Sequence, residues 1–398
     1  MTNLSLCSGF GGLDLAVEQI TGNKTLVYAE NDKYAAQVMA ARFPWATNLH
    51  DITKADWAAV AAQYQIHTLT AGFPCQGLSN AGLRKGLADA RSGIWTNVAQ
   101  AVRIIRPRLV FLENVAAIRS RGLGEVVAEL AAIGYDARWT CVRAGDPAVG
   151  APHPRDRWFL IAHPVAEDPD SAAWRERWAA APGEAEGRRA RADTGGRGGV
   201  PAAAPTGDDG VVLMSTPTVA DARCSRNWTS RRTPGKKFNA GKTLTDIAWL
   251  LPTPAASNPN DSESIESWEA RRQRNLAKKI NGNGQGTPLS IAVRKAELGP
   301  ERWVTSDGVD YGPAVRRWEA LLGRPAPEPT EPGARGNRRL TPQFVEWLMG
   351  CPEGWVTGLD LPRAQQLKIL GNGVVTRQAV EGYRRLLCAD LEAMATAA

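Results

Sequence analysis

Near its beginning the chain reads LSLCSGFGGL at residues 4–13, a short apolar run that gives way to three glycines. The run predicts a strand over residues 4–7, and the amphipathic residues 13–20 that follow predict a helix. Glycines at a strand-to-helix turn let a ligand approach the backbone and leave helix N-terminal amides facing that ligand. This part of the chain therefore indicates a ligand-binding turn, which we call the glycine turn (residues 7–12).

The alternation of strand and helix continues to about residue 165. Apolar runs predict further strands at residues 25–29, 68–71, 109–112, 139–142 and 158–162, and amphipathic segments predict helices at residues 33–41, 95–105 and 125–133. That alternation is typical of a parallel sheet with helices on its faces. Ligands of such sheets bind at the carboxyl ends of the strands, so we expect functional residues on the loops there.

Composition narrows the class of protein. The chain has 398 residues, 43% hydrophobic and 22% charged, which suits one large domain with an insertion, or two domains. Its six cysteines are scattered without a CxxC pair, so we expect reduced thiols in a cytoplasm and neither a disulfide framework nor a zinc site. No apolar run approaches the about 20 residues of a membrane span, and the sequence predicts no signal peptide. A net charge of +7 favours a polyanionic partner.

A second loop carries a cysteine. Residues 71–79 read AGFPCQGLS and follow the strand predicted at residues 68–71. The proline before Cys75 fixes the backbone and so holds the thiol in place, which suits a nucleophile. The alternative is a small buried hydrophobic side chain, the commoner role of a free cysteine.

Two acidic residues lie at the ends of neighbouring strands. Glu30 follows the strand predicted at residues 25–29, where a carboxylate can accept hydrogen bonds from ribose hydroxyls, and its alternative is a solvated charge. Asp51 lies where a third strand would end and could accept a hydrogen bond from an adenine amino group. It could equally cap a helix over residues 54–63, and the sequence favours neither alternative.

Charged residues also flank two later strands. Glu113 ends the apolar strand at residues 109–112, so we expect it to be partly buried, with a raised pKa and a proton to share with a ring nitrogen. The alternative is a glutamate in a buried ion pair. Arg155 and Arg157 alternate before the strand at residues 158–162 and therefore point to one face, which suits recognition of a carbonyl or a phosphate. Their alternative is a solvated edge.

In this order, the motifs resemble those of the DNA (cytosine-5)-methyltransferases. The resemblance rests on the glycine turn, Pro74-Cys75-Gln76, Glu113-Asn114-Val115, the Arg155/Arg157 pair, RLTP at 339–342 with LMGCP at 348–352, and GNGVV at 371–375. It covers residues 3–165 and 338–387. Three positions depart from the usual family pattern: Cys7-Ser8 replaces Phe-Ala, His50 replaces a glycine, and His153 replaces a glutamine. None of these changes removes a group that the chemistry needs.

The resemblance implies a Rossmann-like α/β methyltransferase sheet with helices on both faces and a smaller inserted target-recognition domain. It implies a catalytic domain at residues 1–165, a linker and target-recognition region at 166–362, and a C-terminal helix at 363–398 that returns to the glycine turn. The implied methyl donor is S-adenosylmethionine. The residues implied to bind it are Ser8, Phe10, Gly11, Gly12, Glu30, Asp51, Pro74 and Asn372.

The resemblance also implies catalytic roles. Cys75 would add to carbon 6 of a cytosine flipped out of the duplex, so that carbon 5 can attack the methyl group. Glu113 would hold a proton at ring nitrogen 3, and Arg157 would bind the ring carbonyl. Arg155 would either hold backbone phosphate or support the loop. The sequence does not identify the base that removes the carbon 5 proton.

The middle of the chain differs in composition. Residues 167–210 are rich in Ala, Arg, Gly and Pro, which is typical of a linker. Two approximate copies of one pattern follow, with Thr-Pro pairs at residues 216–217 and 253–254, and each carries a run of basic residues. Basic residues interleaved with aromatics suit a surface that reads a DNA groove, whereas the alternative is a basic domain that only packs on its neighbour.

The predicted partner is duplex DNA, with no metal and no membrane. We expect a monomer in the nucleoid-associated cytoplasm of a bacterial or phage-infected cell, where a cognate restriction endonuclease would act separately. Three other functions are open. A tRNA cytosine methyltransferase shares the fold, although the basic insert favours DNA. A nicotinamide-dependent oxidoreductase needs a third glycine that residues 9–14 lack at the GxGxxG spacing, and a non-catalytic DNA-binding relative has no need of Cys75, Glu113 and Arg157.

Overall fold

The structure of the chain is a computed structural model. It describes residues 1–74, 93–165, 250–256, 262–278, 286–297, 302–306, 308–333 and 338–397, with the backbone alone for residues 389–397. Contacts group the chain into one unit formed by Met1–Ser171 with Trp249–Ala398 and another formed by Ala172–Ala248. Cys75 and the first basic copy of the predicted target-recognition region lie outside the described residues.

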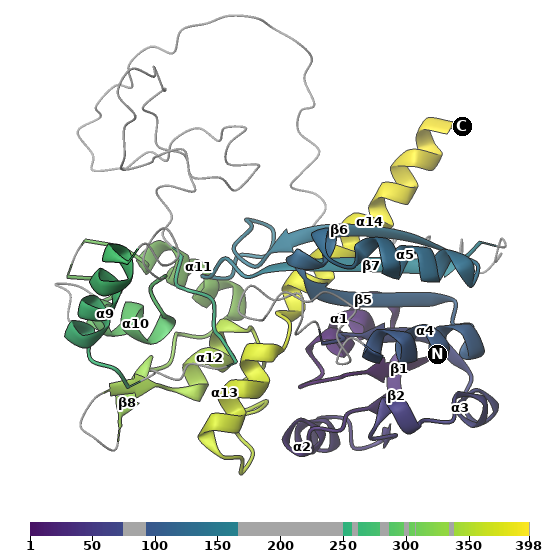
Figure 1. Ribbon diagram of the computed structural model, residues 1–398, viewed down its shortest axis with the longest axis horizontal. Coiled ribbons are helices and arrows are strands. Elements are labelled where there is room, and N and C mark those ends of the chain that lie inside the picture. The colour runs from purple at the N-terminus through teal and green to yellow at the C-terminus, as the bar shows by residue number, and fades with distance from the viewer. Residues whose placement is uncertain are drawn as a thin grey trace, which may run out of the picture. The chain divides into compact units, whose positions relative to one another are not determined.

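A seven-stranded sheet in the order β3-β2-β1-β4-β5-β7-β6 forms the centre of the first unit (Figure 1). Its strands are β1 (Thr2–Leu6), β2 (Lys24–Ala29), β3 (Thr47–Asn48), β4 (Ile66–Ala71), β5 (Leu109–Val115), β6 (Tyr135–Arg143) and β7 (Asp156–Pro164). The prediction of a parallel sheet is confirmed for β1 to β5, which pair with one another only in parallel. It is wrong for β7, which runs antiparallel to both β5 and β6. Residues 144–155 between β6 and β7 contain no helix, so the chain turns back directly beside the strand it has just left.

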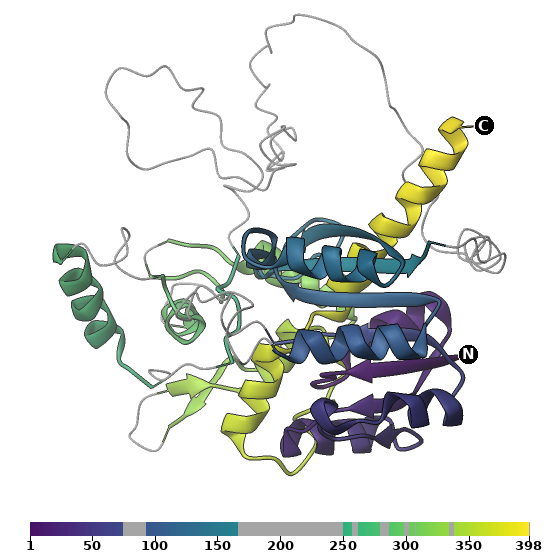
Figure 2. The same ribbon diagram turned by 45° about the vertical axis from the view of Figure 1, so that its right-hand side comes forward.

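Helices cover both faces of the sheet (Figures 1 and 2). On one face α1 (Gly12–Thr21) packs with the C-terminal α14 (Thr376–Ala397), and on the other α3 (Trp57–Gln63) packs with α4 (Gly93–Ile105). The remaining helices of this part are α2 (Lys33–Arg42) and α5 (Leu123–Ala132). All four helices predicted between residues 13 and 133 are confirmed to within two residues at each end. Tyr383 of α14 is buried, packs its ring against Phe111 and Phe159, and donates its hydroxyl to the Leu112 carbonyl at 3.0 Å.

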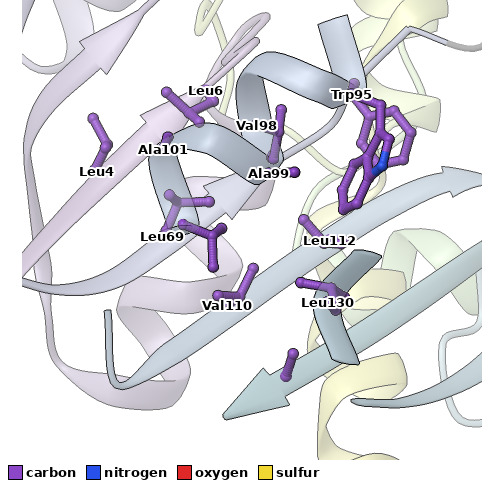
Figure 3. Packing of buried hydrophobic residues seen from close by; sticks show 14 of the residues in the cluster. Leu4, Leu6, Leu69, Trp95, Val98, Ala99, Ala101, Val110, Leu112 and Leu130 are labelled. Carbon is purple, nitrogen blue, oxygen red and sulfur yellow. The ribbon is translucent and has the colours of Figure 1, made fainter. Parts of the chain in front are cut away.

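The core lies between the sheet and the α3–α4 face (Figure 3). Leu4, Leu69, Val110 and Leu112 from the central strands are fully buried and meet Val98 of α4. Central parallel strands are covered on both sides, which explains why they read as nearly continuous apolar runs in the sequence. A buried Leu of this kind stabilises the fold by about 1.5–3 kcal/mol.

The segments after residue 249 add further elements around α12. They are α9 (Ile265–Ala277), α10 (Leu289–Glu297), α11 (Gly312–Leu322), β8 (Thr330–Pro332), β9 (Arg338–Leu340), α12 (Pro342–Leu348) and α13 (Arg363–Asn372). Three stacked rings, Trp303, Phe344 and Trp347, lie with successive centroids 5.7 Å apart. In the described part of the chain no helix is both long and apolar enough to span a membrane.

Candidate active site

The glycine turn is a backbone structure held by one carboxylate. Gly9 and Gly11 adopt left-handed backbone angles that favour glycine, and Gly11 caps the N-terminus of α1. The Gly9 amide donates to Glu30 Oε2 at 2.9 Å, while Glu30 Oε1 accepts from the Asp32 amide at 2.9 Å. Burial raises the pKa of Glu30 against these hydrogen bonds. A Cβ on Gly9 would meet nothing within 4 Å, so this part of the turn faces open space next to a carboxylate.

The Phe10 side chain is buried within the protein. It is 1% exposed, and a Cβ on Gly12 would approach its ring to 2.5 Å and one on Gly373 to 1.9 Å. The ring is therefore enclosed by glycines from two distant parts of the chain, and Thr376 at the start of α14 adds a hydrogen bond to the Gly12 carbonyl at 3.1 Å. The ring therefore packs inside the protein and helps to fix the shape of the glycine turn.

The other predicted cofactor residues surround this turn unevenly. Ser8 is largely buried and accepts a hydrogen bond from the Ser5 hydroxyl at 2.7 Å. Pro74 is exposed just after β4, and Asn372 is exposed at the end of α13. A Cβ on Gly11 would lie 2.5 Å from the Phe43 ring, so Gly11 allows close packing of α1 against the end of α2.

Asp51 acts as a helix cap. Its Oδ1 accepts from the Thr53 amide at 3.0 Å and the Thr53 hydroxyl at 2.8 Å, at the start of the 3₁₀ helix η1 (Ile52–Lys54). These hydrogen bonds, with Lys54 nearby, lower the Asp51 pKa. The longer helix is capped instead by Asp56, at the N-terminus of α3. Asp51 therefore caps the short helix before the one that was predicted, and its Oδ2 lies 3.9 Å from Lys54 Nζ in an exposed ion pair.

Glu113 and Arg157, which we call the acid–arginine pair, meet across β5 and β7. Arg157 Nε lies 2.9 Å from Glu113 Oε1, and the two side chains are only 15% and 13% exposed. Burial raises the pKa of Glu113 as expected, with the charges of Arg157 and Arg155 opposing that rise. The alternative of an ion pair is therefore also present, and its cation is Arg157, which was itself predicted to be a catalytic residue.

The acid–arginine pair lies beside the segment that leads to Cys75. A Cβ on Gly72 would be 3.4 Å from Glu113 Oε2, so the backbone after β4 passes close to the carboxylate. The next residue of β5, Asn114, is buried and donates from Nδ2 to the Phe73 carbonyl at 3.1 Å. The sequence places Asn114 in a motif but predicts no role for it. Its position directly after Glu113, at the end of an apolar strand, is the feature that could have indicated this contact.

Arg155 is directed away from this pair and into the protein. It is 3% exposed, and its guanidinium donates to the carbonyls of Pro254, Gly371 and Gly373. Burial and the positive charge of Arg157 lower its pKa. A buried guanidinium cannot reach a phosphate, so the geometry favours the second predicted role, which is support of a loop.

His153 and Gln378 complete this interior region. His153 is fully buried, its Nε2 lies 3.0 Å from the Leu348 carbonyl, and burial lowers its pKa to about 3, so the imidazole is neutral and donates from Nε2. Gln378, which the sequence did not indicate, donates to the carbonyls of Val142 and Arg155 at 2.8 and 2.7 Å. Among the described residues no group of His, Cys, Asp and Glu could hold a metal ion.

A glycine turn at the end of β1 and a charged pair on β5 and β7 of a largely parallel sheet define the class of Rossmann-like methyltransferases. Within that class the chain belongs to one family, because the model of the C-5 cytosine-specific DNA methylases matches residues 1–386.

Curated relatives are type II methyltransferases. M.NlaX of Neisseria lactamica is 33% identical over 163 residues, 40% of this chain and 50% of that protein. M.CviJI of Paramecium bursaria Chlorella virus IL3A is 32% identical over 160 residues, 40% of this chain and 42% of that protein. M.HhaI of Haemophilus parahaemolyticus is 33% identical over 162 residues, 40% of this chain and 47% of that protein. The matched part thus spans half or less of each relative's length.

Solved structures agree on the fold. S. pombe Dnmt2 has a TM-score of 0.50 at 15% identity and covers 98% of this chain and 99% of that chain. The Entamoeba histolytica methyltransferase EhMeth has a TM-score of 0.50 at 15% identity and covers 98% of both chains.

Proposed function

We propose that the chain is a sequence-specific DNA methyltransferase that transfers a methyl group from S-adenosylmethionine to carbon 5 of cytosine in duplex DNA. The observation that carries the proposal is the largely buried acid–arginine pair, at the end of β5 and the start of β7. Glu113 lies beside Gly72 and its neighbour Asn114 is bonded to Phe73, and these two residues precede Cys75 by three and two positions. Membership of the C-5 cytosine-specific family supports the same reading.

The residues of the glycine turn fit the methyl donor. Open space beside Gly9, α1 amides at the turn and the Glu30 carboxylate provide acceptors and donors for a nucleoside with a charged tail. The Glu30 carboxylate accepts hydrogen bonds from the Gly9 and Asp32 amides, and a carboxylate has about four lone-pair sites, so it can also accept from a ribose hydroxyl. When bound, S-adenosylmethionine supplies an electrophilic methyl group.

The acid–arginine pair would activate the cytosine ring. Cys75 adds as a thiolate to carbon 6, which makes carbon 5 an enamine carbon able to take the methyl group. Glu113, whose pKa is raised, holds a proton at ring nitrogen 3 and so offsets the negative charge that the addition puts on the ring. Arg157 keeps hydrogen-bond donors for the ring carbonyl while Nε stays on Glu113. Removal of the carbon 5 proton by a base then expels the thiolate and restores the ring.

None of these atoms is reachable in a stacked duplex, so the cytosine must be flipped out at a cost of a few kcal/mol. We assign target recognition to residues 166–362, with residues 1–165 and 363–398 forming the catalytic part. In the described section of that region, Arg271 is paired with Glu263 and Arg272 lies over the Trp268 ring. A monomer in the nucleoid-associated cytoplasm, with any restriction endonuclease acting separately, is part of the same proposal.

Covalent trapping tests the proposal. Bisulfite sequencing of DNA from cells that express the chain first identifies the methylated site. A duplex with 5-fluorocytosine at that site, supplied with S-adenosylmethionine, should then form a stable adduct with the wild-type protein and none with Cys75→Ala, because fluorine cannot leave as a proton does. Methylation of tRNA without methylation of DNA would show that the substrate is tRNA. Methylation of DNA without a covalent adduct would contradict the mechanism through Cys75.

A further inference from the structure

The Glu346 carboxylate organises a turn that contacts the glycine turn. Glu346 of α12 is 2% exposed, and its two oxygens accept from the amides of Gly354, Val356 and Thr357 and from the Thr357 hydroxyl at 2.6–2.9 Å. One side chain therefore satisfies four donors of residues 354–357, which we call the Trp355 turn. Hydrogen bonds to a carboxylate are the stronger kind, so the turn has one well-defined shape.

Trp355 connects this turn to the glycine turn. Its Nε1 donates to the Phe10 carbonyl at 2.8 Å, and its ring meets the Phe43 ring edge-to-face with centroids 6.2 Å apart. Arg42, in the last turn of α2, donates to the carbonyls of Gly354 and Trp355. The Trp355 turn is thus attached to both the glycine turn and α2.

The Phe10 carbonyl is a sensitive point of the glycine turn. It lies between Gly9, whose amide holds the Glu30 carboxylate, and Gly11, which caps α1. The Phe10–Gly11 peptide is held by two hydrogen bonds: the Gly11 amide donates to the Ser8 carbonyl at 2.9 Å, and the Phe10 carbonyl accepts from Trp355 Nε1 at 2.8 Å. A change at Trp355 would shift the Gly9 amide and with it the carboxylate that faces the ligand.

We infer that Glu346 is a positioning residue for cofactor binding, which acts through Trp355 on the glycine turn. The inference rests on the proposed function, because it takes S-adenosylmethionine as the ligand of that turn. It also links a helix in the region assigned to target recognition with the cofactor site, through hydrogen bonds and no contact with the ligand.

A second glutamate provides a matched control. Glu319 of α11 accepts from the Ala326 amide at 2.8 Å, so it also holds the turn that follows its helix. Among the described residues, the Glu319 carboxylate holds the Ala326 amide, and Ala326 makes no hydrogen bond to the glycine turn. Loss of either glutamate removes a helix-to-turn hydrogen bond, but only loss of Glu346 should affect the cofactor.

The experiment measures binding of S-adenosylmethionine to the full-length protein by calorimetry, for wild type, Glu346→Gln, Trp355→Phe, the double variant and Glu319→Gln. We expect Glu346→Gln and Trp355→Phe each to weaken binding about 5- to 10-fold, as for one hydrogen bond, and the double variant to be no weaker than the worse single variant. Glu319→Gln should stay within about twofold, because its turn is separate. In turnover, KM for S-adenosylmethionine should rise in the two variants while kcat at saturation is retained.

Several results would overturn the inference. Wild-type affinity in both folded variants would do so, and so would additive losses in the double variant. Trp355→Phe keeps the ring and removes only the donor, so it decides the question if Glu346→Gln does not fold. A wild-type protein that fails to bind S-adenosylmethionine would instead refute the proposed function, and this inference with it.

Discussion

The two sides of the candidate site are built from different materials. The proposed cofactor side is backbone: left-handed glycines, helix amides and one carboxylate that holds them. The proposed base side is formed by side chains, the largely buried Glu113 and its partner Arg157. A turn built from backbone groups is sensitive to the volume of an added side chain. A charged pair is sensitive to the charge and to the length of its two side chains. The two sides should therefore fail in different ways.

The largest effect should come from Cys75→Ala. The thiol acts only on the base, so methyl transfer should be abolished while binding of S-adenosylmethionine stays within about twofold of wild type. Radiolabelled methyl transfer and calorimetry on the same preparation measure the two quantities. Residual turnover in this variant would remove the cysteine from the mechanism.

Glu113→Gln should come next. The single-turnover rate of methyl transfer should fall about 10²-fold, since general acid catalysis is lost, while DNA binding changes little. The raised Glu113 pKa means that the protonated acid persists to higher pH than in an exposed glutamate and is lost as pH rises through that pKa. The wild-type rate should therefore decline over that interval, and the decline should vanish in the variant because an amide does not titrate.

A matched ion-pair change makes this prediction specific. Glu297 pairs with Arg338 at 3.2 Å, away from the acid–arginine pair. Glu297→Gln should leave both the rate and its pH profile unchanged. An altered profile in this control would mean that the pH effect reports general stability.

Gly373→Ala changes the volume of a side chain next to the glycine turn and no charge. The backbone angles of Gly373 suit alanine, but a Cβ would lie 1.9 Å from the Phe10 ring. We expect overpacking to cost about 1–3 kcal/mol in unfolding free energy and to weaken cofactor binding. Chemical denaturation and calorimetry measure these effects.

Gly124→Ala is the matched change for Gly373→Ala. Gly124 is in α5, and its Cβ would meet nothing within 4 Å, so alanine there should be neutral or stabilising by up to about 1 kcal/mol. Equal behaviour of the two variants would show that the Phe10 contact is not tight.

The smallest expected effect comes from substitutions of Asp51, which distinguish a contact with adenine from a role as a helix cap alone. Asp51→Ser keeps a cap for η1 but shortens the side chain, and Asp51→Ala removes both. If Asp51 contacts adenine, both variants should weaken S-adenosylmethionine binding by about fivefold or more. Unchanged binding in Asp51→Ser, with slightly reduced stability in Asp51→Ala, would leave the cap as its only role.

Local pattern predicted strands β1, β2, β4 and β5 and the first helices well, because these elements depend on periodicity and on their own caps, whereas the two-residue strand β3 has no apolar run to indicate it. The antiparallel direction of β7 was not predicted, since apolar runs do not report direction and the helix-free stretch 144–155 was the available signal. Among the site residues, the raised pKa of Glu113 followed from its place at the end of a buried strand.

Contacts between segments that are distant in the sequence could not be predicted from it. Nothing near Arg155 shows that its guanidinium reaches Gly371 and Gly373, and nothing near Phe10 shows that its ring is enclosed by Gly373 and its carbonyl bound by Trp355. Such contacts depend on how the whole chain packs, and they determine which of the predicted side chains are buried and which are exposed.

The enclosure of Phe10 by Gly12 and Gly373, reinforced by a Thr376–Gly12 hydrogen bond across 364 positions of sequence, has a consequence during protein synthesis. The ribosome must translate the entire basic insert before the methyl-donor site can close. We therefore expect a nascent or prematurely terminated chain to be enzymatically silent even though its Cys75 loop has already been made.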